Sequence, residues 1–273
     1  MSRPAARMDC PQLLARLCAP TDAVGPDPAP AVALLRELGL DGCELRTVDG
    51  QEVLDLPASR RRDVAALLRQ AGMSVALLST DIGRGGIEGP AAPQRERLQR
   101  ALELAALFCA PGVRVYAYTG PETRRGEAVE RLARFAELAA GGGVTLLVEN
   151  LPGTYGASGR QLGELIRAVG SPALGALFNP AGFAARKEHP FLSAFSGGPL
   201  KRQLRCLRVR DGTLEDGAPV PPGEGNGELK EIISALMARC YDGLFSLDPG
   251  LSPSPAGFRA ALEAYRAMVD SLL

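Results

Sequence analysis

The chain has 273 residues, 46% of them hydrophobic and 23% charged, and its 31 basic and 31 acidic side chains give a formal net charge of zero. This length and balance fit one large globular domain, so we predict a single domain over residues 1–273. The neutral total argues against a general nucleic-acid-binding surface, and no apolar run approaches the length that spans a membrane.

The cysteines are scattered and form no CxxC pair. We interpret them as reduced, mostly buried thiols of a cytoplasmic protein rather than as disulfides or zinc ligands. The first residues lead into no long apolar core, so we expect no signal peptide. The six positions are Cys10, Cys18, Cys43, Cys109, Cys206 and Cys240.

Strand and helix patterns alternate along the chain. Period-two patterns predict strands at residues 16–18, 41–46, 73–79, 113–118, 144–149, 174–178, 205–210 and 244–248. Helical periodicity predicts helices at residues 31–38, 58–71, 94–110, 127–140, 161–169, around 191–195, 228–240 and 257–273.

This alternation, about eight times without a linker, favours a (β/α)8 barrel, also called a TIM barrel, over a doubly wound sheet. No GxGxxG follows a strand and no GxxxxGK[ST] is present, so neither common nucleotide-binding loop supports the sheet alternative. We therefore predict a single (β/α)8 barrel.

The segment 205–211 carries arginines on one face of its strand. Leu207 and Val209 share the face that packs on the outer helices, whereas Cys206, Arg208 and Arg210 face the barrel interior. A buried guanidinium without a partner costs several kcal/mol. Because Glu149 and Asp248 end strands on either side, we expect them to pair with Arg208. For Cys206, a small apolar filler is the simpler interpretation.

Active sites of such barrels form at the carboxyl ends of the strands, so the last inward-facing residues are the site candidates. The alternative is that some of them are solvated rim residues, and that Glu44 and Arg46 simply pair with each other. Arg114 faces the same way but lies deeper in its strand. The candidates are Glu44, Arg46, Ser79, Tyr116, Tyr118, Glu149, Asn179, Arg208, Arg210 and Asp248.

Short motifs at successive strand ends resemble the xylose-isomerase-like TIM barrels, specifically the sugar phosphate isomerase/epimerase family. They are GLDGCELR at 39–46, VALLSTDIG at 75–83, LLVENLPGTYG at 146–156, LFNPAGF at 177–183, LRVRD at 207–211, PGEGNG at 222–227 and YDGLFSLDPGL at 241–251. The resemblance implies a divalent cation (Mn, Mg or Co) held by Glu, Asp, His and Glu, with the glutamates moving a proton next to a carbonyl.

This chain departs from the family's metal-binding pattern at three of four positions. Glu149 matches the first glutamate, but Asn179 replaces Asp, Arg208 replaces the His of the usual His-Val-Lys-Asp, and Asp248 replaces the last Glu. Gly250 stands where many relatives have a His. Since a guanidinium cannot lose its proton, we expect no metal cofactor, with Arg208 in the metal's place. If a metal binds after all, Glu149, Asn179, Asp248 and water are its expected ligands.

We therefore expect an isomerase/epimerase-like protein for a sugar, a sugar phosphate or a related hydroxy-carbonyl compound. Glu149 is the expected base, Asp248 the partner acid and Arg208 the group that stabilises the enolate oxygen. The arginines also predict a small polar or anionic ligand. Glu224, in the loop that follows the seventh predicted strand at 205–210 (the strand-seven loop), is a further candidate for contact with it.

Two other interpretations stay open. One is a catalytically inactive barrel that binds a ligand or a partner, and the other is a repurposed lyase or cyclase. His189, the only histidine, lies between charges and a proline, so it is expected to be a solvated loop residue. A homo-oligomer is compatible with the sequence.

Overall fold

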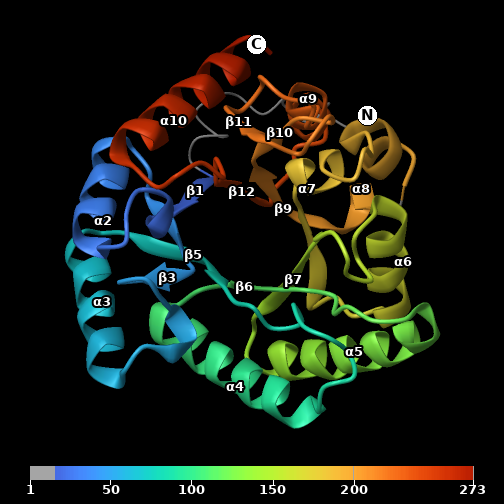
Figure 1. Cartoon of the computed structure of the whole chain (residues 1–273). Helices are drawn as coiled ribbons and strands as arrows, with labels where there is room; N and C mark the ends of the chain where they lie inside the picture. Colours follow the sequence, from blue (N-terminus) through green and yellow to red (C-terminus); the bar gives the residue numbers. More distant parts are fainter. Residues whose placement is uncertain (1–15, 199, 273) are drawn as a thin grey trace, which may run out of the picture.

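Eight parallel strands close into a barrel in the computed structural model, which describes residues 16–198 and 200–272 (Figure 1). The barrel strands are β1 (Leu17–Pro20), β2 (Gly42–Leu45), β5 (Ser74–Ser79), β6 (Gly112–Val115), β7 (Thr145–Glu149), β8 (Leu174–Phe178), β9 (Leu204–Val209) and β12 (Leu244–Leu247). Their order around the barrel is β1-β12-β9-β8-β7-β6-β5-β2, so strands that are consecutive in sequence lie side by side and the last pairs with the first. The predicted (β/α)8 barrel is confirmed.

Helices surround the strands on the outside (Figure 1). They are α2 (Pro28–Glu37), α3 (Ala58–Gln70), α4 (Ala91–Phe108), α5 (Arg125–Gly141), α6 (Gly159–Val169), α9 (Leu229–Met237) and α10 (Pro255–Asp270). Three short pieces replace a single long helix between β8 and β9: α7 (Pro180–Ala184), the π-helical η4 (Pro190–Ser196) and α8 (Leu200–Gln203). Single 3₁₀ turns lie at η1 (Thr21–Ala23), η2 (Val53–Asp55) and η3 (Glu122–Arg124).

Helix α2 begins earlier than the predicted 31–38 because the proline-rich stretch before it is part of the helix. Pro28 occupies the first turn, where a missing N–H costs nothing, and the Asp27 side chain accepts a hydrogen bond from Ala29 N at 2.9 Å. Helix α6 also begins at a cap, since Ser158 and Gln161 form a reciprocal capping box. Because the prolines were interpreted as a loop signal, the predicted start of this helix is too late.

Two short hairpins at the barrel mouth were not predicted from the sequence. They pair β3 (Thr47–Val48) with β4 (Gln51–Glu52), and β10 (Asp211–Gly212) with β11 (Pro219–Val220). Strands of two residues are too short to show alternation, so no period reveals them.

The barrel interior is layered along the strands. Leu77, Leu147, Leu177 and Cys206 form one buried apolar cluster, with Leu244 packed against it. Since side chains alternate along a strand, the residue two positions further on each strand also faces inward. These next residues are Ser79, Glu149, Asn179, Arg208 and Ser246. The sequence thus builds an apolar floor beneath a polar layer, and the polar layer ends at the mouth.

Within residues 16–198 and 200–272, no helix combines the length and the apolar character needed to cross a membrane.

Candidate functional site

The deepest part of the polar layer is an ion pair between Arg208 of β9 and Glu44 of β2. The Arg208 side chain is 1% exposed and that of Glu44 is fully buried. Arg208 donates from Nη1 to Glu44 Oε2 at 2.5 Å and from Nη2 to Oε1 at 3.2 Å. The hydroxyls of Ser79 and Ser246 also donate to Glu44, at 2.5 and 2.6 Å. Glu44 is therefore the hydrogen-bonded partner of Arg208, and it pairs with Arg208 rather than with Arg46. The expected ion pairs of Arg208 with Glu149 and Asp248 are present but longer, at 3.5 and 4.0 Å.

Burial raises the pKa of Glu44, but Arg208 and Arg46 overcome this effect and hold it below its ordinary value. Burial likewise acts to lower the pKa of Arg208, while Glu44 and Glu149 raise it well above its ordinary value. Both groups are consequently charged at neutral pH, and each carries the charge that the other requires.

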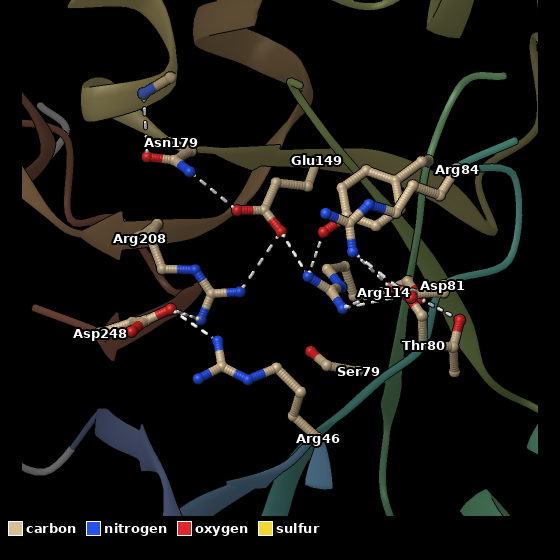
Figure 2. A network of polar contacts seen from close by, with 12 residues as sticks. Arg46, Ser79, Thr80, Asp81, Arg84, Arg114, Glu149, Asn179, Arg208 and Asp248 are labelled. Atoms are coloured by element: carbon tan, nitrogen blue, oxygen red, sulfur yellow. Dashed lines mark hydrogen bonds and ion pairs between the residues drawn. The ribbon is translucent and has the colours of Figure 1, made fainter. Parts of the chain in front are cut away.

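Glu149 ends β7 and lies between two guanidinium groups (Figure 2). Its Oε2 accepts a hydrogen bond from Arg114 Nη1 at 3.0 Å and lies 3.5 Å from Arg208 Nη2. Its Oε1 accepts a hydrogen bond from Asn179 Nδ2 at 2.9 Å. Although burial raises the pKa of Glu149, Arg208 and Arg114 lower it, and the result lies below the ordinary value. Glu149 is therefore a carboxylate at neutral pH.

Asp248 follows β12 and is shared by three arginines. Its Oδ2 lies 2.9 Å from Arg46 Nη1, 3.6 Å from Arg210 Nη1 and 4.0 Å from Arg208 Nη1. Burial alone would raise its pKa, but Arg46, Arg208 and Arg210 lower it to about 2. A group ionised down to this pH does not fit the expected role of partner acid.

Arg114 connects Glu149 to Tyr116. The Arg114 guanidinium is held by Thr80 O at 3.0 Å and donates from Nη1 to both the Tyr116 hydroxyl and Glu149. Burial and Glu149 raise the pKa of Tyr116 to about 12, so its phenol stays protonated and can donate a hydrogen bond. Gly83, with φ of +76°, lets its backbone approach that of Tyr116 closely, since a Cβ there would lie 2.2 Å from Tyr116 O.

A pocket of about 460 Å³ opens above this layer at the barrel mouth. It is lined mainly by polar and charged side chains from the loops that follow the strands. The charged lining residues are Arg46, Asp81, Arg84, Arg114, Glu149, Arg210, Asp211 and Asp248.

The structure divides the predicted site residues into three groups. Those that line the pocket are Arg46, Tyr116, Glu149, Asn179, Arg210 and Asp248. Glu44, Ser79 and Arg208 lie buried beneath it, at 0, 2 and 1% exposure, so they do not face a ligand in this arrangement. Tyr118 and Glu224 lie away from the pocket.

Tyr118 does not share a face with Arg114 and Tyr116 because β6 ends at Val115 and Tyr118 adopts φ of 57°. Its ring is buried in the core beneath Arg131, whose guanidinium carbon lies 5.5 Å from the ring centroid. Glu224 is exposed on the strand-seven loop.

That loop is organised by Asp211 rather than by Glu224. The buried Asp211 carboxylate accepts hydrogen bonds from the backbone N–H groups of Gly212, Gly223, Gly225 and Gly227, at 2.7–3.1 Å. A Cβ at Gly225 or Gly227 would lie 2.4 or 2.6 Å from Asp211 Oδ1. The glycines of the 222–227 motif therefore let the loop wrap around a carboxylate.

Several site residues were missed by the sequence reasoning. Ser246 lies two residues before Asp248, so it faces the same side of the strand and could have been predicted from the same alternation. Asp81 and Arg84 follow β5 in a loop, and Asp22 follows the short β1, where no period marks an orientation. Asp22 binds Arg46 through Nε at 2.9 Å.

The residues present do not fit the divalent cation of the family pattern. The available oxygen atoms already face cations or N–H donors, since Glu149 and Asp248 face guanidinium groups and Asn179 Oδ1 accepts from Gly182 N at 3.2 Å. In the part of the chain that the structure describes, no three or more His, Cys, Asp or Glu side chains converge on a common point that could hold a metal ion.

The single histidine and the cysteines lie outside this chemistry. His189 is 54% exposed and its Nδ1 lies 3.1 Å from Glu228 Oε1. Cys18, Cys43 and Cys206 are buried free thiols, as expected, and burial raises the pKa of each. Cys109 and Cys240 are exposed, however, because each follows a helix end. Cys10 lies outside the described residues.

Residues 32–268 match the family described as Xylose isomerase-like TIM barrel, and the chain belongs to that family. Its closed barrel and the placement of its polar residues at the strand ends agree with this membership. No match was found among curated proteins.

Solved structures with the same fold include three that are 17–19% identical to this chain. A xylose isomerase-like TIM barrel protein from Mycobacterium smegmatis, in complex with magnesium, is 19% identical with a TM-score of 0.71, covering 90% of this chain and 89% of that one. A probable 3-DHS dehydratase, AsbF, from Bacillus anthracis is 18% identical with a TM-score of 0.73, covering 94% and 98%. A D-tagatose 3-epimerase-like protein is 17% identical with a TM-score of 0.74, covering 94% and 98%.

Proposed function

We propose that this protein moves a proton next to the carbonyl group of a sugar, sugar phosphate or related hydroxy-carbonyl compound, and that it does so without a divalent metal. The observation that carries the proposal is the buried Arg208 guanidinium, which lies 2.5 Å from Glu44, 3.5 Å from Glu149 and 4.0 Å from Asp248. A fixed cation among these carboxylates supplies the positive charge that a metal supplies in relatives, and it repels a second cation.

In this proposal Glu149 takes the proton from the carbon next to the carbonyl. Its Oε1 accepts one hydrogen bond from the described residues, from Asn179, and the carboxylate lines the pocket. The C–H electron pair then forms a C=C bond and the carbonyl π pair moves to oxygen, which gives an enediolate. Transfer of the proton of the neighbouring hydroxyl to that oxygen re-forms a carbonyl at the hydroxyl carbon, and return of the proton from Glu149 to the former carbonyl carbon completes an isomerisation.

The carbonyl oxygen needs a donor that reaches the pocket, which favours Tyr116 and Arg114 over the buried Arg208. Because Arg114 Nη1 binds both the Tyr116 hydroxyl and Glu149, the proton acceptor and the oxyanion donor lie side by side. Donation from a guanidinium to the phenol oxygen also makes the phenol a stronger hydrogen-bond donor.

The test is solvent deuterium exchange in D₂O, followed by NMR, on dihydroxyacetone, the ketohexoses and their phosphates. We expect exchange that survives EDTA, falls by a factor of about 100 or more in Glu149→Gln, and falls about tenfold in Tyr116→Phe. Loss of exchange on EDTA and recovery with Mn²⁺ would rule out metal-free chemistry.

A second candidate is a ligand-binding barrel without catalysis, and one observation favours it. Arg208 and Arg114 hold the pKa of Glu149 low despite its burial, whereas an efficient base has a pKa near the working pH. Relatives of this fold carry epimerase-like and dehydratase names, so the fold by itself does not choose between these activities or a lyase or cyclase. Binding of the compounds above with no exchange in any of them would support this candidate.

The cytoplasmic location belongs to the same proposal and is supported by the three buried free thiols.

A further inference from the structure

The carboxylates of the pocket leave the N–H groups of one pocket arginine, Arg210, largely without hydrogen bonds. Arg46 donates to Asp22 and Asp248, Arg114 to Glu149, and Arg208 to Glu44. Among the described residues, Arg210 has no hydrogen-bonded carboxylate, and its closest carboxylate oxygen is Asp248 Oδ2 at 3.6 Å. Its side chain is 34% exposed and lines the pocket, so its donors are available to a ligand.

The Arg210 guanidinium lies close to Gly250. The two residues follow β9 and β12, which pair in parallel with Val209 opposite Leu247. A Cβ on Gly250 would lie 2.5 Å from Cζ, Nε and Nη2 of Arg210, so the guanidinium lies against the glycine backbone. Gly250 also has φ of +69°, a conformation that favours glycine. A glycine at position 250 therefore permits both the left-handed backbone conformation of the turn and the close approach of the Arg210 guanidinium.

Arg46 lies beside Arg210. Its Nη1 contacts the same Asp248 oxygen at 2.9 Å, and its Nε is bound to Asp22. Its other terminal nitrogen, Nη2, makes no hydrogen bond to any residue that the structure describes, and the side chain lines the pocket. Two guanidiniums therefore share one carboxylate oxygen and both retain N–H groups that can bind an anion.

Apart from Asp248, which Arg210 shares with Arg46, the acidic residues of the pocket are engaged with other groups. Glu149 is held by Arg114 and Arg208, and Asp211 by four backbone N–H groups. Asp81 lies 3.4 Å from Arg84 and 4.0 Å from Arg114.

We propose that Arg210 and Arg46 form the subsite for an oxyanion of the ligand, a phosphate or a carboxylate group, with Gly250 as the seat of Arg210. The proposal narrows the ligand class of the proposed function and rests on it only in placing the ligand in this pocket. The anionic group would lie near β9 and β12, on the side of the pocket away from Arg114 and Tyr116, so the same molecule could present a carbonyl to Glu149.

Binding of inorganic phosphate, glycerol 3-phosphate and glycerate, measured by isothermal titration calorimetry at low ionic strength, tests the subsite without any catalysis. We expect at least one of these anions to bind with 1:1 stoichiometry, and affinity to fall about 10- to 100-fold in Arg210→Gln. Arg210→Lys keeps the charge but loses the planar guanidinium, so its affinity for the anion should lie between those of the unaltered protein and Arg210→Gln. Comparison of the three anions distinguishes a phosphate from a carboxylate ligand.

Arg160→Gln is the matched control, because it removes the same charge from an 86% exposed side chain on α6. This variant should bind the anions as the unaltered protein does, and thermal melting of each variant checks folding. Absence of binding for all three anions, or equal affinity in the Arg210 variants, would overturn the subsite. Anion binding that depends on Arg210 together with no deuterium exchange would retain the subsite and reject the catalytic proposal. Deuterium exchange without anion binding would reject the subsite and retain the catalytic proposal.

Discussion

Arg208 is a large, fully buried cation, and its burial is tolerable only because Glu44 is buried with it. Each guanidinium and carboxylate taken from water loses several kcal/mol of solvation, which the partner and further hydrogen bonds must offset. Ser79 and Ser246 provide two of these bonds to Glu44. The pair is therefore a unit, and removal of one member is worse than removal of both charges.

We predict that Arg208→Met destabilises the protein by about 3–5 kcal/mol, because Glu44 is left as an unpaired buried charge. Adding Glu44→Gln to that variant should restore part of the loss, since no uncompensated charge is left between them. Urea unfolding of both single variants and the double variant measures the coupling. Strictly additive losses would show that the two residues do not act as a pair.

Asp248 predicts a specific pH dependence of stability. Its pKa falls from an ordinary value of 3.8 to about 2 in the folded protein, so its stabilising contribution is full above about pH 4 and is lost as the pH falls toward 2. This contribution is about 2 kcal/mol. The stability difference between the unaltered protein and Asp248→Asn should shrink by that amount between pH 5 and pH 2. A difference that stays constant over this range would contradict the arginine ring around Asp248.

At the scale of elements, the strand-seven loop shows how one carboxylate shapes a wall of the pocket. Asp211 begins β10, and three of its four backbone hydrogen bonds, from Gly223, Gly225 and Gly227, fold residues 222–227 back onto the hairpin. The sequence marked this motif through its glycines and assigned Glu224 to the ligand. The function of the glycines could not be inferred, because it depends on Asp211, which the chain brings back only through the hairpin.

We predict that Asp211→Ala loosens this loop and costs on the order of 3 kcal/mol, because four N–H groups lose a charged acceptor. Hydrogen exchange should speed up at the amides of residues 212, 223, 225 and 227. Asp216→Ala is the control, since Asp216 accepts from Ala218 N at 2.9 Å in the same hairpin but is exposed. Equal protection of the loop in both variants would contradict the role of Asp211.

At the scale of the whole molecule, the alternation of strands and helices was sufficient to predict the barrel, and side-chain parity predicted which residues face inward. Parity could not predict which of them pair. Arg208 and Glu44 are separated by 164 residues, and they meet only because the barrel closes through β1 and β12 and a long arginine crosses the interior. Parity also failed for Tyr118, since a single left-handed residue beyond a strand end breaks the period.

The replacement of a metal by Arg208 is the central claim, and metal content tests it most directly. Protein purified without chelator and incubated with Mn²⁺ or Mg²⁺, then passed through a desalting column, should retain well below one ion per chain by inductively coupled plasma mass spectrometry. Arg208→His removes the buried cation and supplies an imidazole, so it should retain more metal than the unaltered protein. Near-stoichiometric metal in the unaltered protein would show that Arg208 does not exclude the ion, and the metal-dependent mechanism of the family would then apply.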